Sequence, residues 1–392
     1  MTAPLLLKGF EVEMYTGRPD GTVVGCAAEA ARELPGFVTE PDQRNLEYVT
    51  APARSYREHL ALLLAPRQRL RPWLAGRGLT LLPGSTLSTG DSSRFERSDP
   101  SNPYHSYIES RYGTRVVTAS VHLNLGLTPD AGFSTMEQLF AALRLVRCEA
   151  ALLLSLSASS PFLDGRVGGA HSLRWLQFPL TPPQVPLFIS HQHYIDWMEA
   201  QLISGTMQNV RHLWTSVRPN GEHRPHGLNR LEIRICDLAA DPILLLAIMA
   251  FAELRIQQSL RDPRNEDPLV ASSLQASQLA ELADANDRAA ARSSLDAPLH
   301  HWRDGREILC RTWLSDLLSK LEPLALELGL SSSLRHLHTV LEEGNVSLRW
   351  LNLHKGGMSI AEIIAAGAAE LETQERSLAA ALATDPTPAP LG

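Results

Sequence analysis

The chain has 392 residues, of which 44% are hydrophobic and 20% charged, and a formal net charge of −7. These values are close to those of ordinary soluble globular proteins and allow a large core in one domain or two. The negative charge argues against a nucleic-acid-binding surface. The longest apolar run, residues 243–254, is too short to span a bilayer. The four cysteines lie far apart without a C-x-x-C pair, and no apolar leader follows Met1, so we expect reduced thiols and a cytoplasmic location.

The first predicted strand, GFEVEMYTG in residues 9–17, carries two carboxylates on one face. Side chains of an extended chain alternate between faces, so Glu11 and Glu13 point one way while Phe10 and Val12 point the other. Glutamate is depleted in strands, and two like charges so close repel each other. This face therefore needs a compensating group.

A second strand is predicted at RNLEYVT, residues 44–50. Its alternation places Glu47 on the face opposite Leu46 and Tyr48. Glu47 is thus a third acid on a polar strand face.

A helix and a long loop follow this strand. Ser55 and Glu58 form a predicted capping box at the start of the helix, and Gly76 ends it. Residues 83–107 are dense in Ser, Asp and Pro and are predicted to be loop. A structureless stretch of that length inside a compact domain is usually functional or mobile.

A third strand is predicted within VVTASVHLNLGL, residues 116–127. Its period of two places Ser120, His122 and Asn124 on one face and aliphatic side chains on the other. This strand adds an imidazole and an amide to the polar set.

A second long helix is predicted at 134–156, with Ser134 and Glu137 as its capping box. The glycine-rich segment 156–175 follows and includes Arg174. Glycine-rich loops let backbone amides approach a ligand, but the sequence contains no G-x-x-x-x-G-K-[ST] motif.

A hairpin supplies the last predicted strand. The chain has strand character up to Arg218 and then turns around residues 219–221. The strand NRLEIRICD, residues 229–237, then places three charged side chains on one face: Arg230, Glu232 and Arg234.

After Pro242 the pattern becomes helical. Residues 243–383 have helical periodicity and good caps, such as Ser359 with Glu362. We expect these helices to pack on the first half, so that residues 1–383 form a single catalytic domain. The proline-rich tail, 384–392, is predicted to be disordered.

Taken together, these strands predict a metal site. The alternative is a solvated sheet face, the usual meaning of alternation in an antiparallel sheet. Converging carboxylates and an imidazole, however, are unstable together without cations. Oxygen-rich sites with one imidazole suit Mg²⁺ or Mn²⁺, and nearby arginines suit phosphate or carboxylate groups. Metals and arginines on one sheet favour phosphoryl transfer.

Several long motifs, in order, resemble those of the glutamate–cysteine ligase family, most closely its cyanobacterial type. The family is part of a group of carboxylate–amine ligases related to glutamine synthetase. The motifs are GFEVEMYTG, RNLEYVTAP, SVHLNLG, LSASSPFLDGRVGGAHSLRW, GTMQNVRHLWTSVRPNG and NRLEIRICD. The resemblance implies an α+β, glutamine-synthetase-like fold: a curved, mainly antiparallel sheet forms a funnel, helices cover its convex side, and the C-terminal half is helical.

The resemblance also implies a metal-binding set. Glu11 and Glu13 match the family's paired acids in the first strand, and Glu47 matches the acid in the next. His122 resembles the ligand of the bacterial enzymes' equivalent strand, where plant relatives have Gln. Glu232 matches the metal acid of the E-x-R motif and is assigned a catalytic role.

Arginines of the same motifs are implied in substrate binding and catalysis. Arg234 matches the partner of the transferring phosphoryl group, and Arg174 resembles the arginine that holds the carboxylate of glutamate. Asn124, Arg218 and Arg230 are further assigned to substrate binding.

The implied reaction uses ATP and Mg²⁺, with Mn²⁺ as an alternative metal. ATP phosphorylates the γ-carboxylate of L-glutamate, and the amine of L-cysteine attacks the acyl phosphate to give γ-glutamylcysteine, the first step of glutathione biosynthesis. Water must be excluded from the acyl phosphate, so residues 84–113 are our candidate lid. We expect small-molecule partners, with neither nucleic acid nor membrane.

Three other functions stay open at this point. A related ligase would join a different amine or amino acid, because pocket shape decides specificity. A non-catalytic relative would have lost a metal acid, and none is missing. A metal-dependent hydrolase would need an activated water and a general base, which the arginine-rich set suits less well.

Other polar residues are weaker candidates. His191 and His193 lie two positions apart and do not share a helix face, whereas zinc-binding helices use a spacing of four. Arg288 lies on a predicted helix, where a solvated role and a substrate contact are equally open. Trp302 and Arg303 precede a predicted turn, and whether they face the site stays open.

Overall fold

The computed structural model describes residues 4–126, 135–179, 182–207, 213–219 and 228–384. Within these ranges seven strands form one antiparallel sheet, in the order β2-β3-β1-β5-β9-β8 with β4 paired to the end of β1. The strands of this sheet are β1 (Leu7–Gly17), β2 (Phe37–Thr39), β3 (Asn45–Val49), β4 (Thr80–Leu82), β5 (Val121–Gly126), β8 (Thr215–Pro219) and β9 (Leu228–Ile233). Two small hairpins lie outside it: β6 (Phe162–Leu163) with β7 (Arg166–Val167), and β10 (Pro298–His300) with β11 (Glu307–Leu309).

One face of the sheet is apolar and is covered by helices. Phe10, Val12 and Met14 of β1 are buried on this face, as the alternation predicts. The ring of Phe10 meets that of His59 on α2 at 5.2 Å, and α4 contacts β8 and β9. The three covering helices are α2 (Tyr56–Ala75), α4 (Met136–Ser157) and α7 (Pro242–Arg261). The predicted α+β fold, with a mainly antiparallel sheet and helices on one side, is confirmed.

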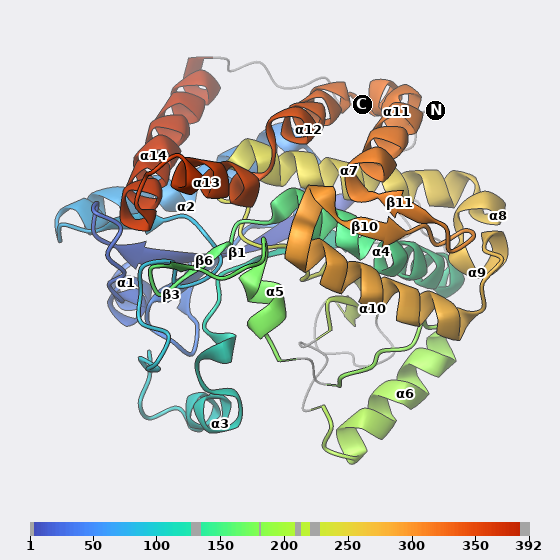
Figure 1. Cartoon of the computed structure of the whole chain (residues 1–392), viewed down its shortest axis with the longest axis horizontal. Helices are drawn as coiled ribbons and strands as arrows, with labels where there is room; N and C mark the ends of the chain where they lie inside the picture. The colour runs from blue at the N-terminus through green and yellow to red at the C-terminus, as the bar shows by residue number, and fades with distance from the viewer. Residues whose placement is uncertain (1–3, 127–134, 180–181, 208–212, 220–227, 385–392) are drawn as a thin grey trace.

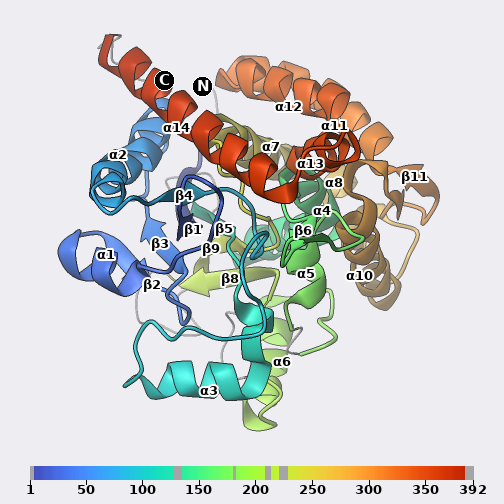
Figure 2. The same ribbon diagram turned by 60° about the vertical axis from the view of Figure 1, so that its left-hand side comes forward.

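The remaining helices extend this layer or lie at its edges. In Figures 1 and 2, α3 and α6 lie at the end of the molecule away from α12 and α14. One hydrophobic core runs from Leu6 to Leu371 and includes side chains from both halves of the chain. These helices are α1 (Ala27–Glu33), α3 (Pro103–Tyr112), α5 (Leu173–Gln177), α6 (His191–Ile203), α8 (Pro263–Glu266), α9 (Pro268–Ala271), α10 (Ala276–Ser293), α11 (Cys310–Leu328), α12 (Ser331–Glu343), α13 (Val346–Lys355) and α14 (Ile360–Thr384).

Two of the three predicted helix starts are confirmed. The Ser55 side chain accepts a hydrogen bond from the Glu58 backbone amide, and Ser359 and Glu362 cap each other reciprocally. The third was misplaced by one residue: Thr135 caps α4 by accepting from the amide of Gln138. A threonine fills this position as well as a serine does, because its hydroxyl reaches the same free amide.

Two predicted strands are shorter in the structure, and part of the predicted loop 83–107 is helical. Residues 113–116 form a 3₁₀ turn, and β5 begins only at Val121. The strand β9 ends at Ile233, before Arg234. Within the predicted loop 83–107, α3 begins at Pro103, because Asn102 caps its first turn and proline is favoured there.

Two predictions fall outside the described residues. Residues 220 and 221 of the predicted hairpin turn and residues 385–392 of the predicted disordered tail lie outside the described ranges.

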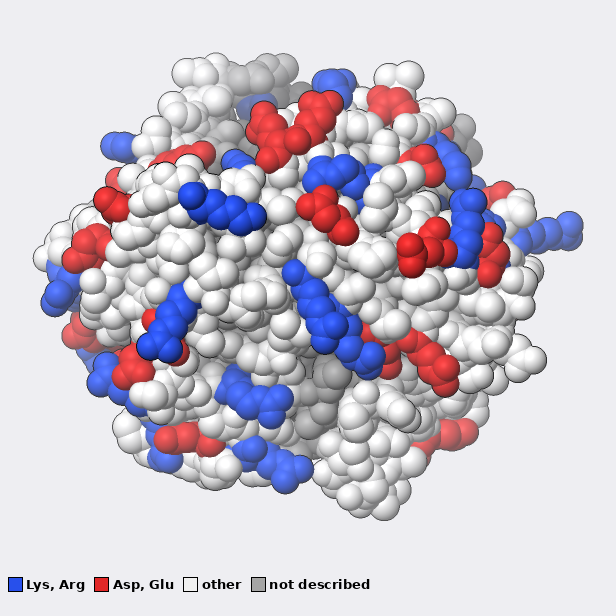
Figure 3. Space-filling view, viewed as in Figure 1, with Lys and Arg blue, Asp and Glu red and all other residues white. Residues whose placement is uncertain are grey.

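The helix α7 is long and apolar enough, by composition, to cross a bilayer. It is 20 residues long, although its longest wholly apolar run is shorter. Inside the molecule, 83% of its apolar window is buried, so it serves as a core helix here. The face shown in Figure 3 carries basic and acidic side chains interspersed rather than one large patch of a single sign.

Candidate active site

The sheet register brings the predicted acids together on the face opposite the helices. Glu13 of β1 lies across from Glu47 of β3, and Glu11 lies across from His122 of β5. Ser120 Oγ donates to Glu13 Oε2 at 2.9 Å, and His122 Nε2 lies 3.4 Å from Glu13 Oε1. From Phe10 to Met14, β1 therefore has acids on one face and core side chains on the other.

The neighbouring strand completes a compact donor set. Glu232 of β9 lies across from Asn124. One ligand atom from each of Glu11, His122 and Glu232 falls within 4.8 Å of the other two. Glu11 also forms hydrogen bonds with His122 Nδ1 at 2.8 Å and with Asn124 Nδ2 at 3.1 Å. Oxygen donors with one imidazole at this spacing fit a hard divalent cation.

Glu40 is a further acid of this cluster that our sequence analysis missed. Burial and the charge of Glu13 raise the pKa of Glu40. Burial and the charges of Glu40 and Glu13 raise the pKa of Glu47 still further, and the two side chains hydrogen-bond. Carboxylates this crowded hold a proton when no cation neutralises them. Their chemistry therefore also fits a bound divalent cation.

A sequence signal for Glu40 existed. Val38 pairs with Glu47 across β2 and β3, so the two share a face. Two residues later, Glu40 lies on the same face by alternation. The short run FVTE was not interpreted as a strand, because strands this short carry little periodicity.

The pKa values of Glu11 and Glu232 are instead lowered. Burial would raise the pKa of Glu11, but the hydrogen bond from His122 and the charges of His122 and Arg234 outweigh it and hold the pKa well below its usual range. Burial likewise opposes ionisation of Glu232, yet the charges of Arg234 and Arg218 lower its pKa. The guanidinium of Arg234 lies 3.0 Å from Glu232 Oε1, and that of Arg218 lies 3.1 Å from Oε2. These two acids are therefore ionised.

Arg174 is a buried cation, and it lines the same cavity as the acids described above. Its guanidinium donates to the backbone carbonyls of Ile235 and Arg234 at 3.1 and 2.9 Å, and its Nε has no hydrogen-bond partner in the described structure. Among the described residues it forms no salt bridge with a carboxylate. Burial lowers its pKa. An anionic ligand would supply the missing partner.

Asp237 fixes the loop that carries Arg174. Its carboxylate accepts hydrogen bonds from the hydroxyls of Ser160 and Ser172 at 2.6 and 2.7 Å and from the amide of Ser159 at 3.0 Å. Burial raises the pKa of Asp237. The sequence alone does not indicate this role, because the partners of Asp237 come from a distant loop.

A cavity of about 510 Å³ lies over the polar face. Its wall includes the acids and histidine named above with Arg174, Arg218, Arg230 and Arg234. Toward α3 and α5 the wall is more apolar, with Tyr104, Ile108 and Phe178. A second cavity, of about 250 Å³, lies at the other end of β1 and shares Glu11 and Arg230 with the first. Asn124 lines only this second cavity.

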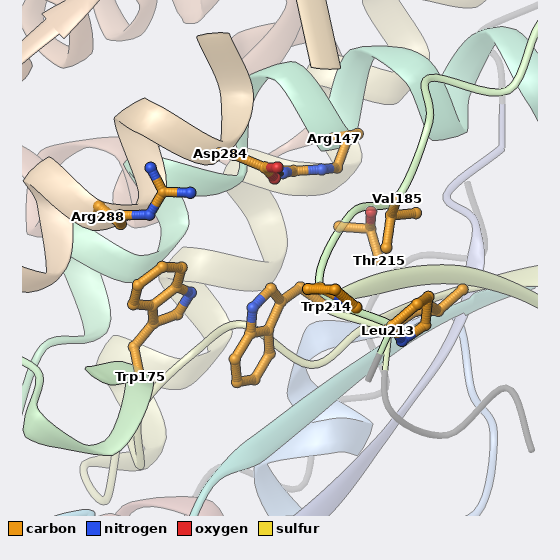
Figure 4. Close-up of a pocket in the computed structure, with 10 residues that line it drawn as sticks. Arg147, Trp175, Val185, Leu213, Trp214, Thr215, Asp284 and Arg288 are labelled. Carbon is orange, nitrogen blue, oxygen red and sulfur yellow. Dashed lines mark hydrogen bonds and ion pairs between the residues drawn. The ribbon is translucent and has the colours of Figure 1, made fainter. Parts of the chain in front are cut away.

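A third recess lies behind Trp214, whose ring also lines the main cavity. It holds about 30 Å³, and Figure 4 shows Trp175 and Trp214 below the pair of Arg147 and Asp284, with Arg288 beside that pair. Arg147 also bonds Asp287 at 2.8 Å, so its charge is neutralised. This recess is too small for a nucleotide or an amino acid.

The weaker sequence candidates lie elsewhere. Trp302 is buried and donates to Glu149 at 3.0 Å, and Arg303 bonds Glu266, so neither lines the main cavity. His191 and His193 lie in the first turn of α6, away from it. The four cysteines are buried and free, as expected.

A family comparison matches residues 7–368 to glutamate-cysteine ligase family 2. Among curated proteins, one from Nocardia farcinica, provisionally named glutamate–cysteine ligase 2-2, is 30% identical over 59% of this chain and 57% of its own length. One from Rubrobacter xylanophilus, provisionally named 2-1, is 26% identical over 82% of both. For another protein of that organism the match spans only 46% of its length, so the chain spans about half of some curated relatives.

Two solved structures share the fold. A glutamate–cysteine ligase from Francisella tularensis in complex with AMP has a TM-score of 0.69 at 16% identity, covering 97% of this chain and 92% of that one. A bifunctional glutathione synthetase from Pasteurella multocida has a TM-score of 0.72 at 17% identity, covering 94% of this chain and 52% of that one. At these identities the likeness establishes the fold alone, which is glutamine-synthetase-like.

Proposed function

Because the chain belongs to glutamate-cysteine ligase family 2, we propose that it uses ATP to join the γ-carboxylate of L-glutamate to the amine of L-cysteine. The products are γ-glutamylcysteine, ADP and phosphate. The observation that carries the proposal is the single cavity in which clustered carboxylates face Arg174, a buried cation with no carboxylate partner among the described residues. We also propose a cytoplasmic location, since the four cysteines are free thiols.

Arg174 positions the amino acid. Its guanidinium is held by two backbone carbonyls and lines the cavity, where its charge would pair with the α-carboxylate of glutamate. The Asp237 cluster prevents this side chain from moving. Preorganised donors cost little reorganisation when the substrate binds.

The carboxylate cluster holds divalent cations. Glu11, His122 and Glu232 form one donor set, and Glu13, Glu40 and Glu47 supply further oxygens. Bound Mg²⁺ or Mn²⁺ would neutralise the ATP phosphates that the glutamate carboxylate must approach.

Arg234 and Arg218 stabilise the charge that spreads over the transferring phosphoryl oxygens. Both guanidinium groups are oriented by Glu232, one on each carboxylate oxygen. No side-chain nucleophile is needed, because the carboxylate of the substrate attacks the phosphorus. Catalysis is then mostly positioning and electrostatic stabilisation.

The two cavities separate the substrates. The larger one takes the amino acids, beside Arg174 and the apolar wall of α3 and α5. The smaller one, which shares Glu11 and Arg230 with it, takes the nucleotide. The ATP γ-phosphate would then meet the glutamate carboxylate between them.

Residues 84–113 close the amino-acid side. The segment is tied to the sheet, because Arg44 donates to the carbonyls of Asp91 and Arg94. Its helix α3 contributes Tyr104 and Ile108 to the cavity wall. Limited proteolysis with and without ATP plus glutamate tests the lid: the segment should be protected by substrates, and equal cutting would contradict this role.

ADP release, with glutamate fixed and the amine varied, tests the function. We expect release to depend on glutamate and to rise strongly with cysteine. The variant Glu232→Gln should abolish turnover while the protein stays folded, whereas Glu29→Gln, on the surface of α1, should not change it. Indifference to cysteine together with a response to another amine would instead identify a related ligase with a different acceptor.

A further inference from the structure

Amide formation requires that the acceptor nitrogen lose protons. An acceptor ammonium and an acyl phosphate give an amide, hydrogen phosphate and one free proton. The nitrogen lone pair forms the C–N bond, and the C–O bond to phosphate breaks with its electron pair moving to the phosphate. One proton departs with the phosphate, and the other must be taken from the ammonium before attack. A general base near the acceptor nitrogen therefore speeds the second half-reaction.

Most titratable groups of the main cavity already have another task. Glu11, Glu13 and His122 bond one another at the cation cluster. Glu232 is paired with two arginines. His105 lies apart from these groups, on the α3 side of the cavity that we propose takes the amino acids.

Ser98 sets the tautomer of His105. The Ser98 hydroxyl donates its one hydrogen to the backbone carbonyls of Glu40 and, at 3.3 Å, Pro41. His105 Nδ1 lies 3.4 Å from the same oxygen. Because that hydroxyl hydrogen is already used, the oxygen can only accept, so Nδ1 carries the ring proton. Nε2 is therefore left as the proton-accepting nitrogen.

The position of His105 is fixed by its helix. Asn102 and Pro103 set the start of α3. His105 and Ile108, one turn apart, are both buried and both line the main cavity. Ser98 is itself fixed by the carbonyls of Glu40 and Pro41, so its hydroxyl holds the imidazole in one orientation.

We propose that His105 is the general base that removes a proton from the acceptor ammonium during attack on the acyl phosphate, a role that rests on the proposed ligase function. The ring accepts the proton on Nε2 while Ser98 accepts the hydrogen bond from Nδ1. The proton then passes to solvent. Imidazole suits this role because it accepts and releases protons near neutral pH.

The test compares two acceptors in the full-length enzyme. Cysteine presents an ammonium at neutral pH, whereas the nitrogen of hydroxylamine is uncharged and needs no base before attack. His105→Gln should lower kcat with cysteine by about 10²-fold or more, the usual range for a lost general base. Hydroxamate formation from glutamate, ATP and hydroxylamine should stay close to that of the unsubstituted enzyme.

Ser98→Ala supplies a second variant that keeps the imidazole. Without the hydroxyl, the ring proton is no longer fixed on Nδ1. We therefore expect a smaller loss of kcat with cysteine than in His105→Gln, and again little loss with hydroxylamine. His300→Gln, at an exposed position on β10 outside the cavity, is the matched control and should change neither rate.

The outcomes separate the two proposals. Equal losses with both acceptors in His105→Gln, or no loss with either, would overturn the general-base role while the ligase function stands. If the unsubstituted enzyme forms neither hydroxamate nor ADP in the presence of glutamate, the ligase function itself is wrong, and the base role falls with it.

Discussion

The two faces of the central sheet carry buried charges of the same types but treat them differently. On the helix-covered face, Lys8 of β1 lies 3.1 Å from Glu253 of α7, which also accepts from the Tyr56 hydroxyl at 2.6 Å. On the cavity face, Glu40 and Glu47 crowd together, and Arg174 forms no salt bridge within the described structure. On the first face each of these charges has an oppositely charged partner, whereas on the second face Glu40, Glu47 and Arg174 lack one among the described residues.

The difference shows how to distinguish a structural charge from a functional one. A second buried group on the helix side consists of three residues: Arg255 lies 2.7 Å from Glu149 and 2.8 Å from Glu266. Breaking a buried pair leaves a charge without a partner and destabilises a protein strongly. Removing a charge from a like-charged cluster relieves repulsion instead. Stability and activity should therefore respond in opposite directions on the two faces.

The largest effect is expected on the helix-covered face. Glu253→Gln leaves the Lys8 ammonium buried without a carboxylate and should cost about 3–5 kcal/mol of unfolding free energy. Urea denaturation measures this change. Glu327→Gln, which breaks the surface pair with Arg261, is the control and should cost at most about 1 kcal/mol. Equal effects would show that burial of the first pair does not matter.

On the cavity face, substitutions should lower activity more than they lower stability. Arg234→Ala should lower kcat by about 10²–10³-fold, the range for losing one electrostatic contact at a reacting centre. Steady-state ADP release at saturating substrates measures it. Arg261→Ala on the surface should leave kcat unchanged, and an unaltered rate in Arg234→Ala would refute the phosphoryl role.

Arg174→Ala should act mainly on binding. Losing a charge-assisted hydrogen bond of about 1.5–3 kcal/mol should raise KM for glutamate by about 10–100-fold. Initial rates at varied glutamate separate KM from kcat. A fall in kcat at an unchanged KM would mean that Arg174 acts on the transition state rather than on the bound amino acid.

The smallest effect concerns how stability depends on pH when a chelator keeps cations from the carboxylate cluster. The pKa of Glu40 is raised to about 7, above its unfolded value near 4.3, so the folded state binds the proton more tightly. This stabilisation is fully present below about pH 4.3 and is lost as pH rises through about 7. In the presence of a chelator, the Tm should therefore fall as the pH rises from about 4.3 to about 7.

Glu47→Gln sharpens this prediction. The pKa of Glu47 is itself raised to about 10, so this acid contributes its own part of the decline, and removing it should weaken the decline. Relief of the repulsion should also stabilise the chelated protein by about 1 kcal/mol, the equivalent of roughly one pKa unit. Added Mg²⁺ should also weaken the decline in the unsubstituted protein, because a ligand that binds only the folded state stabilises it. A slope that neither change affects would place its origin outside the cluster.

The sequence by itself determined which face each side chain of a strand takes. Alternation along β1 placed Glu11 and Glu13 opposite Phe10 and Val12, and the structure agrees. The start of α2 was also readable, since a cap involves residues only three positions apart. Local periodicity contains such information because neighbouring residues fix it.

Only the tertiary structure decided which of these faces meet. Glu40 joins the carboxylate cluster through the pairing of β2 with β3, and Asp237 holds the segment before Arg174 through serines of a distant loop. The partner of Lys8 comes from α7, on the other side of the chain's midpoint. His105 acquired its accepting nitrogen from Ser98, whose own hydrogen is held by Glu40. Contacts between residues far apart in sequence produce no periodic pattern along the chain. Only the folded chain therefore shows whether a buried charge has a partner within the protein.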